Sequence, residues 1–337
     1  MSEKFASRHR LFADVPNGVA NRTSWPWMDT NESYSARYAP QSGGRALKIS
    51  VVTPNYNGVQ FIEEAMRSVL LQGYPELEYI IIDGGSSDGS VEIIKNYEPW
   101  LHYWVSEPDS GQAQAINKGL ARCTGEIVAF LNSDDMYLPG AFDLVADLFA
   151  SSPDVMWVCG ACDVTNQSTG YRQRWEPRLS SRVSEFILGS PAAQPATFLN
   201  ATVIRRLGLL DEEMHYSFDH EYWVRMADAE FRPTLTDAAL AMFRLHPLSK
   251  TCNADAQFIP EDIEIARRYL GKLQPGERRN IIRWIARSER ALVREQCRKK
   301  GQGNGIVARL QLIRSILHRP DLMSERATWG ALKRPYR

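Results

Sequence analysis

The sequence predicts an α/β protein built on a doubly wound, mostly parallel sheet that is flanked by helices. Between residues 49 and 131, apolar runs typical of strands alternate with helical patterns, and each unit takes roughly 30 residues, as in βαβ folds. The apolar run at residues 127–131 shows no alternation, which fits a strand that is buried on both faces. Polar and acidic residues follow these strands, at the edge where open α/β sheets place their ligands.

The expected elements follow from periodicity and turn residues. In the first half, strands are expected at 49–53, 79–83, 101–105 and 127–131, and helices at 61–70, 91–97 and 112–121. The helix after Pro139 opens a less regular half. There, the expected elements are a strand hairpin at 155–164 and 171–175, short helices at 183–188 and 203–207, a strand at 194–199, a helix at 218–227 and a final strand at 240–245. Before the first strand, Trp25 and Trp27 are expected to hold an irregular arm against the body.

Two adjacent carboxylates, Asp134 and Asp135, end the central strand. An unpaired charge is too costly to bury in a core, so we expect this pair at the ligand-binding edge of the sheet. Oxygen ligands at such a place suit Mg²⁺ or Mn²⁺ that accompanies a phosphate group. A solvated turn with a capping Asp explains the motif equally well, so the two carboxylates alone leave both interpretations open.

Charge is unevenly distributed along a chain whose formal net charge is zero. Residues 260–337 contain 19 Lys or Arg and 8 Asp or Glu residues, a net of +11, and residues 1–259 carry the balancing −11. This asymmetry predicts a body that handles a metal and a tail that meets an anionic partner. We expect a cytoplasmic protein, because no apolar run reaches the roughly 18–20 residues of a membrane span and residues 1–11 lack the core of a signal peptide.

Several common motifs are absent or incomplete. The first strand is followed by Pro54-Asn-Tyr-Asn-Gly58, so neither the GxGxxG fingerprint nor a P-loop is present. The five cysteines form no framework, which indicates a reducing compartment. We interpret the CxxC of Cys159 and Cys162 as core packing, because it lies in an apolar run and has no second pair.

The C-terminal region is predicted to be helical and basic. Six arginines fall within an arc of about 100° on ideal helix geometry: Arg279, Arg283, Arg287, Arg290, Arg294 and Arg298. Such a helix binds an anionic membrane surface or presents a solvated face while it packs on the body, and the pattern leaves both open. A second apolar stripe at residues 306–317 predicts a core or partner contact.

Acidic loops at successive strand ends, together with the segments around them, resemble family 2 glycosyltransferases, the inverting nucleotide-sugar enzymes of the GT-A fold. The resemblance covers residues 48–251. The matching segments are 49–57, 78–90, 107–111, 115–119 and 125–135 in the first half, the acceptor-side blocks 194–198, 207–211 and 218–225, and the closing strand at 243–246. The resemblance implies three regions: an irregular N-terminal arm at 1–46, a GT-A domain at 47–251 that divides into a nucleotide-binding half (47–136) and an acceptor half (137–251), and a helical basic extension at 252–337.

For the donor, the resemblance implies that Asp83 accepts hydrogen bonds from the base of a nucleotide, with uridine the expected base. The other residues that it places near the donor are Pro54, Asn55, Tyr56, Asp88, Gln114, Asn117, Lys118, Asn132, Ser133 and Asp135. Lys118 is available to a phosphate, and Asp88 either caps the following helix or contacts the nucleotide.

For the chemistry, the resemblance implies a divalent metal, Mn²⁺ or Mg²⁺, held by Asp134 and His246. Asn132 stands where many relatives carry Asp, so the D-x-D pattern is altered, although the amide oxygen still suits a hard cation. The general base implied for the acceptor hydroxyl is Asp219, with Glu221 as the reserve candidate. A structural interpretation makes Asp219 a helix cap and His246 a core histidine.

The predicted function is therefore metal-assisted transfer of a sugar from a nucleotide-diphosphate sugar to a glycan or lipid-linked glycan, in surface polysaccharide synthesis. Nucleic acid is not an expected partner, and the basic helix makes peripheral attachment to the inner face of the membrane an open possibility. One alternative is a sugar-phosphate nucleotidyltransferase, which the absence of basic residues in the loop at 54–58 disfavours. Another is a non-catalytic nucleotide-sugar-binding scaffold, which the presence of Asp134, Asp219 and His246 disfavours.

Overall fold

The computed structural model describes residues 15, 25–27, 46–166, 169–178, 180, 182–253 and 255–299. Most of the predicted N-terminal arm and the apolar stripe at 306–317 lie outside these residues, as do the side chains of Arg294 and Arg298. The indole N–H groups of Trp25 and Trp27 donate hydrogen bonds to Tyr137 O (2.9 Å) and Glu64 Oε1 (3.1 Å). These two tryptophans therefore contact the body, as predicted.

The described strands form one nine-stranded sheet in the order β3-β2-β1-β4-β8-β6-β9-β5, with β7 paired to β6. Their bounds are β1 Ile49–Asn55, β2 Leu77–Asp83, β3 Tyr103–Ser106, β4 Ile127–Phe130, β5 Met136–Tyr137, β6 Trp157–Asn166, β7 Tyr171–Trp175, β8 Thr197–Asn200 and β9 Thr234–Arg244. The first four strands pair in parallel. The second half is mixed: β8 is antiparallel to β4 and β6, whereas β9 is parallel to β6. The predicted α/β class is confirmed.

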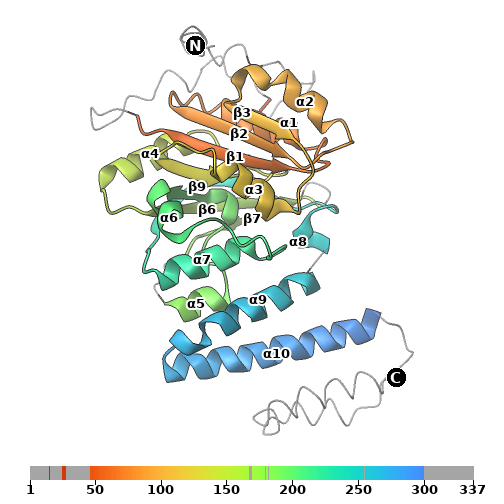
Figure 1. Ribbon diagram of the computed structural model, residues 1–337, viewed down its shortest axis with the longest axis vertical. Helices are drawn as coiled ribbons and strands as arrows, with labels where there is room; N and C mark the ends of the chain where they lie inside the picture. Colours follow the sequence, from red (N-terminus) through yellow and green to blue (C-terminus); the bar gives the residue numbers. More distant parts are fainter. Residues whose placement is uncertain are drawn as a thin grey trace.

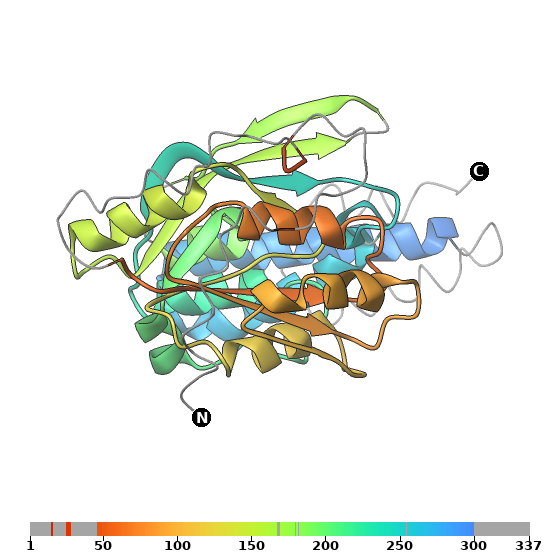
Figure 2. The same cartoon turned by 90° about the horizontal axis from the view of Figure 1, so that it is seen from above.

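Helices cover both faces of the sheet (Figures 1 and 2). Their bounds are α1 Ile62–Leu70, α2 Ser90–Asn96, α3 Gln112–Leu120, α4 Ala141–Ser151, α5 Val183–Leu188, α6 Ala201–Leu207, α7 Phe218–Asp228, α8 Lys250–Asn253, α9 Asp255–Tyr269 and α10 Pro275–Lys299. Single 3₁₀ turns lie at Glu98–Trp100, Gln194–Ala196 and Leu270–Lys272. In Figure 1, α7 lies nearest to the sheet on one side, α5 and α9 lie beyond it at a similar level, and α10 lies farthest away.

Side chains that alternate along each strand divide the core into two buried clusters. On β4, Ile127 and Ala129 join one cluster with α1, α2 and α4, whereas Val128 and Phe130 join the other with α3, α5 and α7. This is the covered sheet that the unbroken apolar run predicts. Cys159 and Cys162 are buried on opposite faces of the sheet, in agreement with a packing role for the CxxC.

The C-terminal helices α9 and α10 belong to the cluster that contains Val128 and Phe130. Ile263, Ile265, Ile281 and Ile285 are buried beside the stacked rings of Trp157 and Trp223, whose centroids are 5.6 Å apart. The basic face of α10 is smaller than predicted: Arg279, Arg283 and Arg287 are exposed, but Arg290 is only 9% exposed. A helical wheel cannot show this difference, because it assigns exposure from one helix alone.

The structure differs from the expected elements at three places. β9 is longer than predicted because Thr234 to Ala239 pair with β6 despite their mixed polarity. The two-residue strand β5, just after the carboxylate pair, was not predicted, and it holds β9 through Met136 and Tyr137. The expected strand at 194–199 begins instead as a 3₁₀ turn and becomes extended at Thr197.

Candidate functional site

The loops after β1, β2, β3 and β4 meet at the carboxyl edge of the parallel strands. Gly58 lies against the loop after β4, since a Cβ there would approach Asn55 Oδ1 to 2.3 Å and Ser133 Oγ to 3.0 Å. Gly84 lies against the loop after β3, since its Cβ would come within 2.7 Å of an Asp109 carboxylate oxygen and 3.2 Å of the Tyr56 ring. These contacts bring three of the predicted donor residues, Asn55, Tyr56 and Ser133, to one edge of the sheet.

Asp83 is fully buried at the end of β2. Its carboxylate accepts hydrogen bonds from Ser106 Oγ (2.6 Å), Ser86 Oγ (2.6 Å), Asn55 Nδ2 (2.7 Å) and the Gly85 and Ser86 backbone N–H groups. Burial acts to raise the pKa of Asp83, but these hydrogen bonds outweigh it and the pKa is lowered. Asp83 thus joins the ends of three strands, and its contact with a base stays a prediction.

Other predicted donor residues also have structural contacts. Asp88 accepts from the backbone N–H groups of Val59 (2.8 Å) and Ser90 (3.0 Å), so it holds the start of α2. Asn117 is buried and bonds to the backbone of Leu210 through both its amide N–H and its carbonyl oxygen.

Two neighbours of Asn117 on α3 bond to carboxylates. Gln114 donates to Glu212 (3.1 Å), and the Lys118 ammonium donates to Glu107 (2.8 Å) and Pro108 O (3.3 Å). Donor contacts of Gln114, Asn117 and Lys118 remain predictions. Tyr56, in contrast, is 69% exposed beside the site, which leaves its ring available to stack on a ligand.

The residues after β4 divide into a buried and an accessible carboxylate. Asp135 is fully buried and accepts a hydrogen bond from the Arg244 backbone N–H (3.0 Å), which anchors β9. Burial and the neighbouring Asp134 raise the pKa of Asp135 well above its ordinary value. Asp134 is partly exposed, and one of its oxygens lies 3.0 Å from His246 Nε2 at the end of β9. The fold thus brings Asp134 and His246 together although they lie 112 residues apart in the chain, and their role as metal ligands stays a prediction.

Asp134 and His246 fit a cation that is held by two protein ligands and completed by phosphate oxygens and water, the arrangement common for Mg²⁺ in nucleotide sites. The Asn132 carbonyl oxygen faces Gln112, whose Nε2 donates to it at 2.6 Å. In the described part of the chain, no three or more His, Cys, Asp or Glu side chains gather into a complete metal cage.

Asp219 lies in the first turn of α7 with His220 and Glu221. Burial raises the pKa of Asp219 above its ordinary value, and the charge of His220 partly opposes this. Its carboxylate accepts the His220 backbone N–H at 2.8 Å. A raised pKa makes the carboxylate a stronger base, as deprotonation of an acceptor hydroxyl requires. The reserve candidate, Glu221, is buried and paired with Arg225 of the same helix.

Helix α9 holds the segment that carries Asp219. Both oxygens of Glu261 accept backbone N–H groups of three consecutive residues, His215 (2.8 Å), Tyr216 (2.8 Å) and Ser217 (2.7 Å). The next residue, Asp262, accepts from His220 Nδ1 at 2.8 Å, and His220 Nε2 lies 2.7 Å from Phe186 O. Burial acts to lower the pKa of His220, but its bond to Asp262 outweighs this and the pKa is raised.

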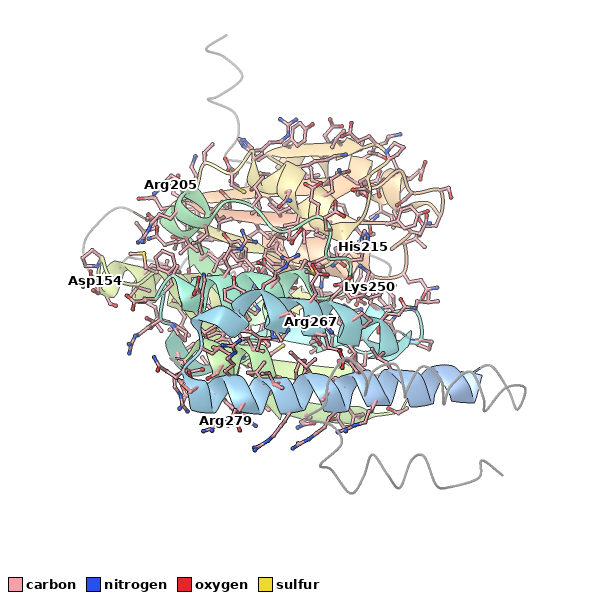
Figure 3. The ribbon with its side chains drawn as sticks, turned by 60° about the horizontal axis from the view of Figure 1, so that its bottom comes forward. Asp154, Arg205, His215, Lys250, Arg267 and Arg279 are labelled. Carbon is pink, nitrogen blue, oxygen red and sulfur yellow. The ribbon has the colours of Figure 1, made fainter. Side chains whose placement is uncertain are left out.

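Lys250 is a site residue that sequence reasoning missed. It begins α8 just beyond β9, and its ammonium donates to His215 O at 2.8 Å. Figure 3 labels His215 and Lys250 next to each other, beside the ribbon of α9 that carries Arg267. In the sequence, Lys250 is marked by no motif, and only its position four residues after His246 could have pointed to it.

Comparison with known proteins accounts for this arrangement. A family model described as glycosyl transferase family 2 matches residues 50–202. The Mycobacterium tuberculosis protein named uncharacterized glycosyltransferase Rv1514c is 30% identical over 189 residues, which cover 54% of this chain and 70% of that protein. The chain belongs to glycosyl transferase family 2.

Other relatives of this family 2 chain match over shorter stretches. TuaG of Bacillus subtilis, named as a putative teichuronic acid biosynthesis glycosyltransferase, is 45% identical over 92 residues, 26% of this chain and 36% of TuaG. The chain spans about half the length of the first curated relatives that it matches, 46% and 58% of two of them.

Solved structures support the GT-A fold of this family 2 chain. S. aureus TarS, solved with UDP-GlcNAc, has a TM-score of 0.58 at 18% identity over 73% of each chain. The mannosyltransferase PcManGT of Pyrobaculum calidifontis, solved with GDP-Man and Mn²⁺, has a TM-score of 0.50 at 18% identity over 88% of each chain. At such low identity these likenesses establish the fold alone.

The hydrogen bonds from residues 215–217 to Glu261 predict that replacing two glutamates of α9 has unequal effects on stability. Glu261→Ala leaves three backbone N–H groups without their acceptor, and should lower the free energy of unfolding by about 1–3 kcal/mol. Glu264→Ala is the matched control: this side chain is exposed and pairs with Arg268, so its loss should change stability by less than about 1 kcal/mol. Denaturant unfolding measures the free energy of unfolding of both variants. Equal decreases would contradict a stabilising role for the hydrogen bonds to Glu261.

Proposed function

We propose that this chain transfers a sugar from a nucleoside-diphosphate sugar to an acceptor hydroxyl by a single displacement that inverts the anomeric carbon. The observation that carries the proposal is the contact between Asp134 and His246, which joins the end of the central strand to the end of β9. Asp109, Asp134 and Asp219 all act electrostatically on Lys250, which supports one site that has both a donor side and an acceptor side.

The reaction requires a base and a stabilised leaving group. Asp219 takes the proton of the acceptor hydroxyl as the oxygen attacks the anomeric carbon, and its raised pKa suits this role. The bond from the anomeric carbon to the β-phosphate oxygen breaks, and its electron pair leaves with the nucleoside diphosphate. One displacement needs one base and no covalent intermediate on the protein.

A divalent metal, Mn²⁺ or Mg²⁺, held by Asp134 and His246, supplies Lewis-acid stabilisation of the diphosphate when it is bound. The side chains around that site have separate tasks. Gln112 orients Asn132 through a 2.6 Å hydrogen bond, Phe61 packs against the His246 ring with centroids 4.3 Å apart, and Asp135 fixes the end of β4 to β9. The presence of Mn²⁺ in the PcManGT complex supports the choice of cation.

For the substrates, we propose a uridine nucleotide as donor and a glycan or lipid-linked glycan as acceptor, in the synthesis of a surface polysaccharide. The complex of TarS with UDP-GlcNAc and the teichuronic acid pathway in the name of TuaG support these choices. The complex of PcManGT with GDP-Man keeps guanosine as the second base to test.

Replacing Asp219 tests the proposed base. Asp219→Asn should lower the transfer rate by about 10²- to 10⁴-fold and spare binding of nucleoside diphosphates, because the amide cannot take a proton. The base must be ionised, and its pKa is raised, so kcat/KM of the unaltered protein should fall with decreasing pH at values above the ordinary Asp pKa. The pH profile of transfer, followed with radiolabelled donor, measures both effects.

The control is Asp228→Asn, which removes a carboxylate from the other end of the same helix. Asp228 pairs with Lys272 on the surface, so its loss should leave transfer unchanged. Full turnover by Asp219→Asn with an unaltered pH profile would remove Asp219 as the base. Absence of transfer by the unaltered protein, with nucleoside diphosphates still bound, would favour a scaffold.

We further propose that the exposed basic face of α10 attaches the protein peripherally to an anionic membrane on the cytoplasmic side. No described helix has the length and apolar character needed to cross a membrane. Arg279, Arg283 and Arg287 are exposed on α10, and Figure 3 shows Arg279 on the outer side of that helix, far from Arg205 on α6.

Vesicle co-sedimentation tests the attachment. Changing Arg279, Arg283 and Arg287 to Ala should weaken binding to anionic vesicles, and salt should weaken binding of the unaltered protein, because each basic residue contributes about 1 kcal/mol near the surface. The control removes the same charge from exposed arginines elsewhere, Arg172, Arg174 and Arg205. Equal binding by the two triple variants would reject the α10 face.

A further inference from the structure

Lys250 lies between the donor and acceptor sides of the site. Its ammonium donates to His215 O at 2.8 Å and lies 5.5 Å from the centre of the Tyr216 ring. His215 in turn lies beside the loop after β3, since a Cβ on Gly111 would be 3.6 Å from His215 Nδ1. The loop that Lys250 holds therefore adjoins the loop that contains Asp109, at the edge where the donor is proposed to bind.

Four carboxylates attract the Lys250 ammonium: Glu261, Asp219, Asp134 and Asp109. Within the described residues none of them forms an ion pair with it, and Glu261 already accepts three backbone N–H groups. An ammonium has three N–H donors, and His215 O occupies one of them. Desolvation by the surrounding protein lowers the pKa of Lys250, and the four carboxylates oppose it. Lys250 thus retains donors for an anion that enters the site.

The other lysine near the donor edge has a different environment. Lys118 forms an ion pair with Glu107 at 2.8 Å and also donates to Pro108 O. A phosphate would have to compete with that carboxylate for Lys118, whereas it would meet no competing ion pair at Lys250. The geometry therefore favours Lys250 over Lys118 as the lysine that receives a phosphate.

We propose that Lys250 binds the diphosphate of the sugar donor and stabilises it as it leaves. This inference rests on the proposed function and adds a residue to it. As the bond between the anomeric carbon and the β-phosphate oxygen breaks, the electron pair passes to the diphosphate. The ammonium donates hydrogen bonds to the phosphate oxygens and keeps its proton, while the acceptor proton goes to Asp219. Charge-assisted bonds of this kind strengthen as the leaving group gains negative charge.

The presence of Asn132 explains why the site would use a lysine in addition to a metal. A neutral amide at that position offers a hard cation less charge than a carboxylate would, so the site holds a metal less strongly. A metal held by Asp134 and His246 would leave coordination positions for phosphate oxygens and water. A lysine that contacts the same diphosphate adds positive charge without needing another metal ligand.

The test compares binding of UDP, UMP and GDP, with Mn²⁺ present, by calorimetry on the full chain. Lys250→Met keeps most of the side-chain length and removes the charge. It should weaken UDP or GDP about 10- to 100-fold, in line with the loss of a charge-assisted hydrogen bond, and weaken UMP by less because UMP lacks the β-phosphate. Lys250→Arg keeps the charge and should retain diphosphate affinity within about threefold. Lys272→Met, on the surface beside Asp228, is the matched control and should change nothing.

Melting temperatures distinguish the inference from a purely structural role. If Lys250 only holds the His215 loop, Lys250→Met should lower the melting temperature and leave the ratio of UDP to UMP affinity unchanged, and that result would overturn the inference. Should Lys250→Met fail to fold, Lys250→Gln is measured in the same way. A wild-type protein that binds neither UDP nor GDP would overturn the proposed function as well, whereas equal UDP affinity in wild type and Lys250→Met would overturn the inference alone.

Discussion

Burial of both faces of the parallel sheet is the constraint on which the rest of the structure depends. Helices on each side cover β1 and β4 completely, so charged side chains can be accommodated only where the strands end. Asp83 ends β2 and Asp134 follows β4 for this reason. Their two environments differ: Asp83 accepts hydrogen bonds from the ends of β1 and β3 and from the loop after β2, whereas Asp134 remains accessible and contacts His246. One carboxylate therefore holds the edge together and the other is available for chemistry.

Part of the proposed acceptor side is formed by residues that lie outside the family match. Glu261 and Asp262 of α9 bind the backbone before α7 and the ring of His220, and α9 itself is anchored by Ile263 and Ile265 in the core. The family model ends at residue 202, so the candidate base Asp219 comes after it, as do Glu261 and Asp262.

Much of the fold and part of the site could be predicted from the sequence. The unbroken apolar run at 127–131 predicts the covered central strand, and the turn residues around Gly208 predict the end of α6. The pairing of Asp134 with His246 follows only from the resemblance, because no periodicity relates residues 112 positions apart. Lys250 and Glu261 escaped prediction because a single charged residue on a helix looks like a solvated face until its neighbours are known. The prediction for Arg290 was wrong in the opposite sense: this arginine lies within the basic arc of the helical wheel, but its side chain is buried.

The most direct test of the account is a thermal-shift panel of UDP, GDP, ADP and CDP, each with and without Mn²⁺, on the unaltered protein and on Asp134→Asn. A ligand that binds the native state raises the melting temperature by mass action. At a hundred times its Kd it increases the free energy of unfolding by about 2.7 kcal/mol. The account predicts stabilisation by one diphosphate, dependent on the metal and lost in Asp134→Asn. A flat panel, or stabilisation that Asp134→Asn retains in full, would contradict it.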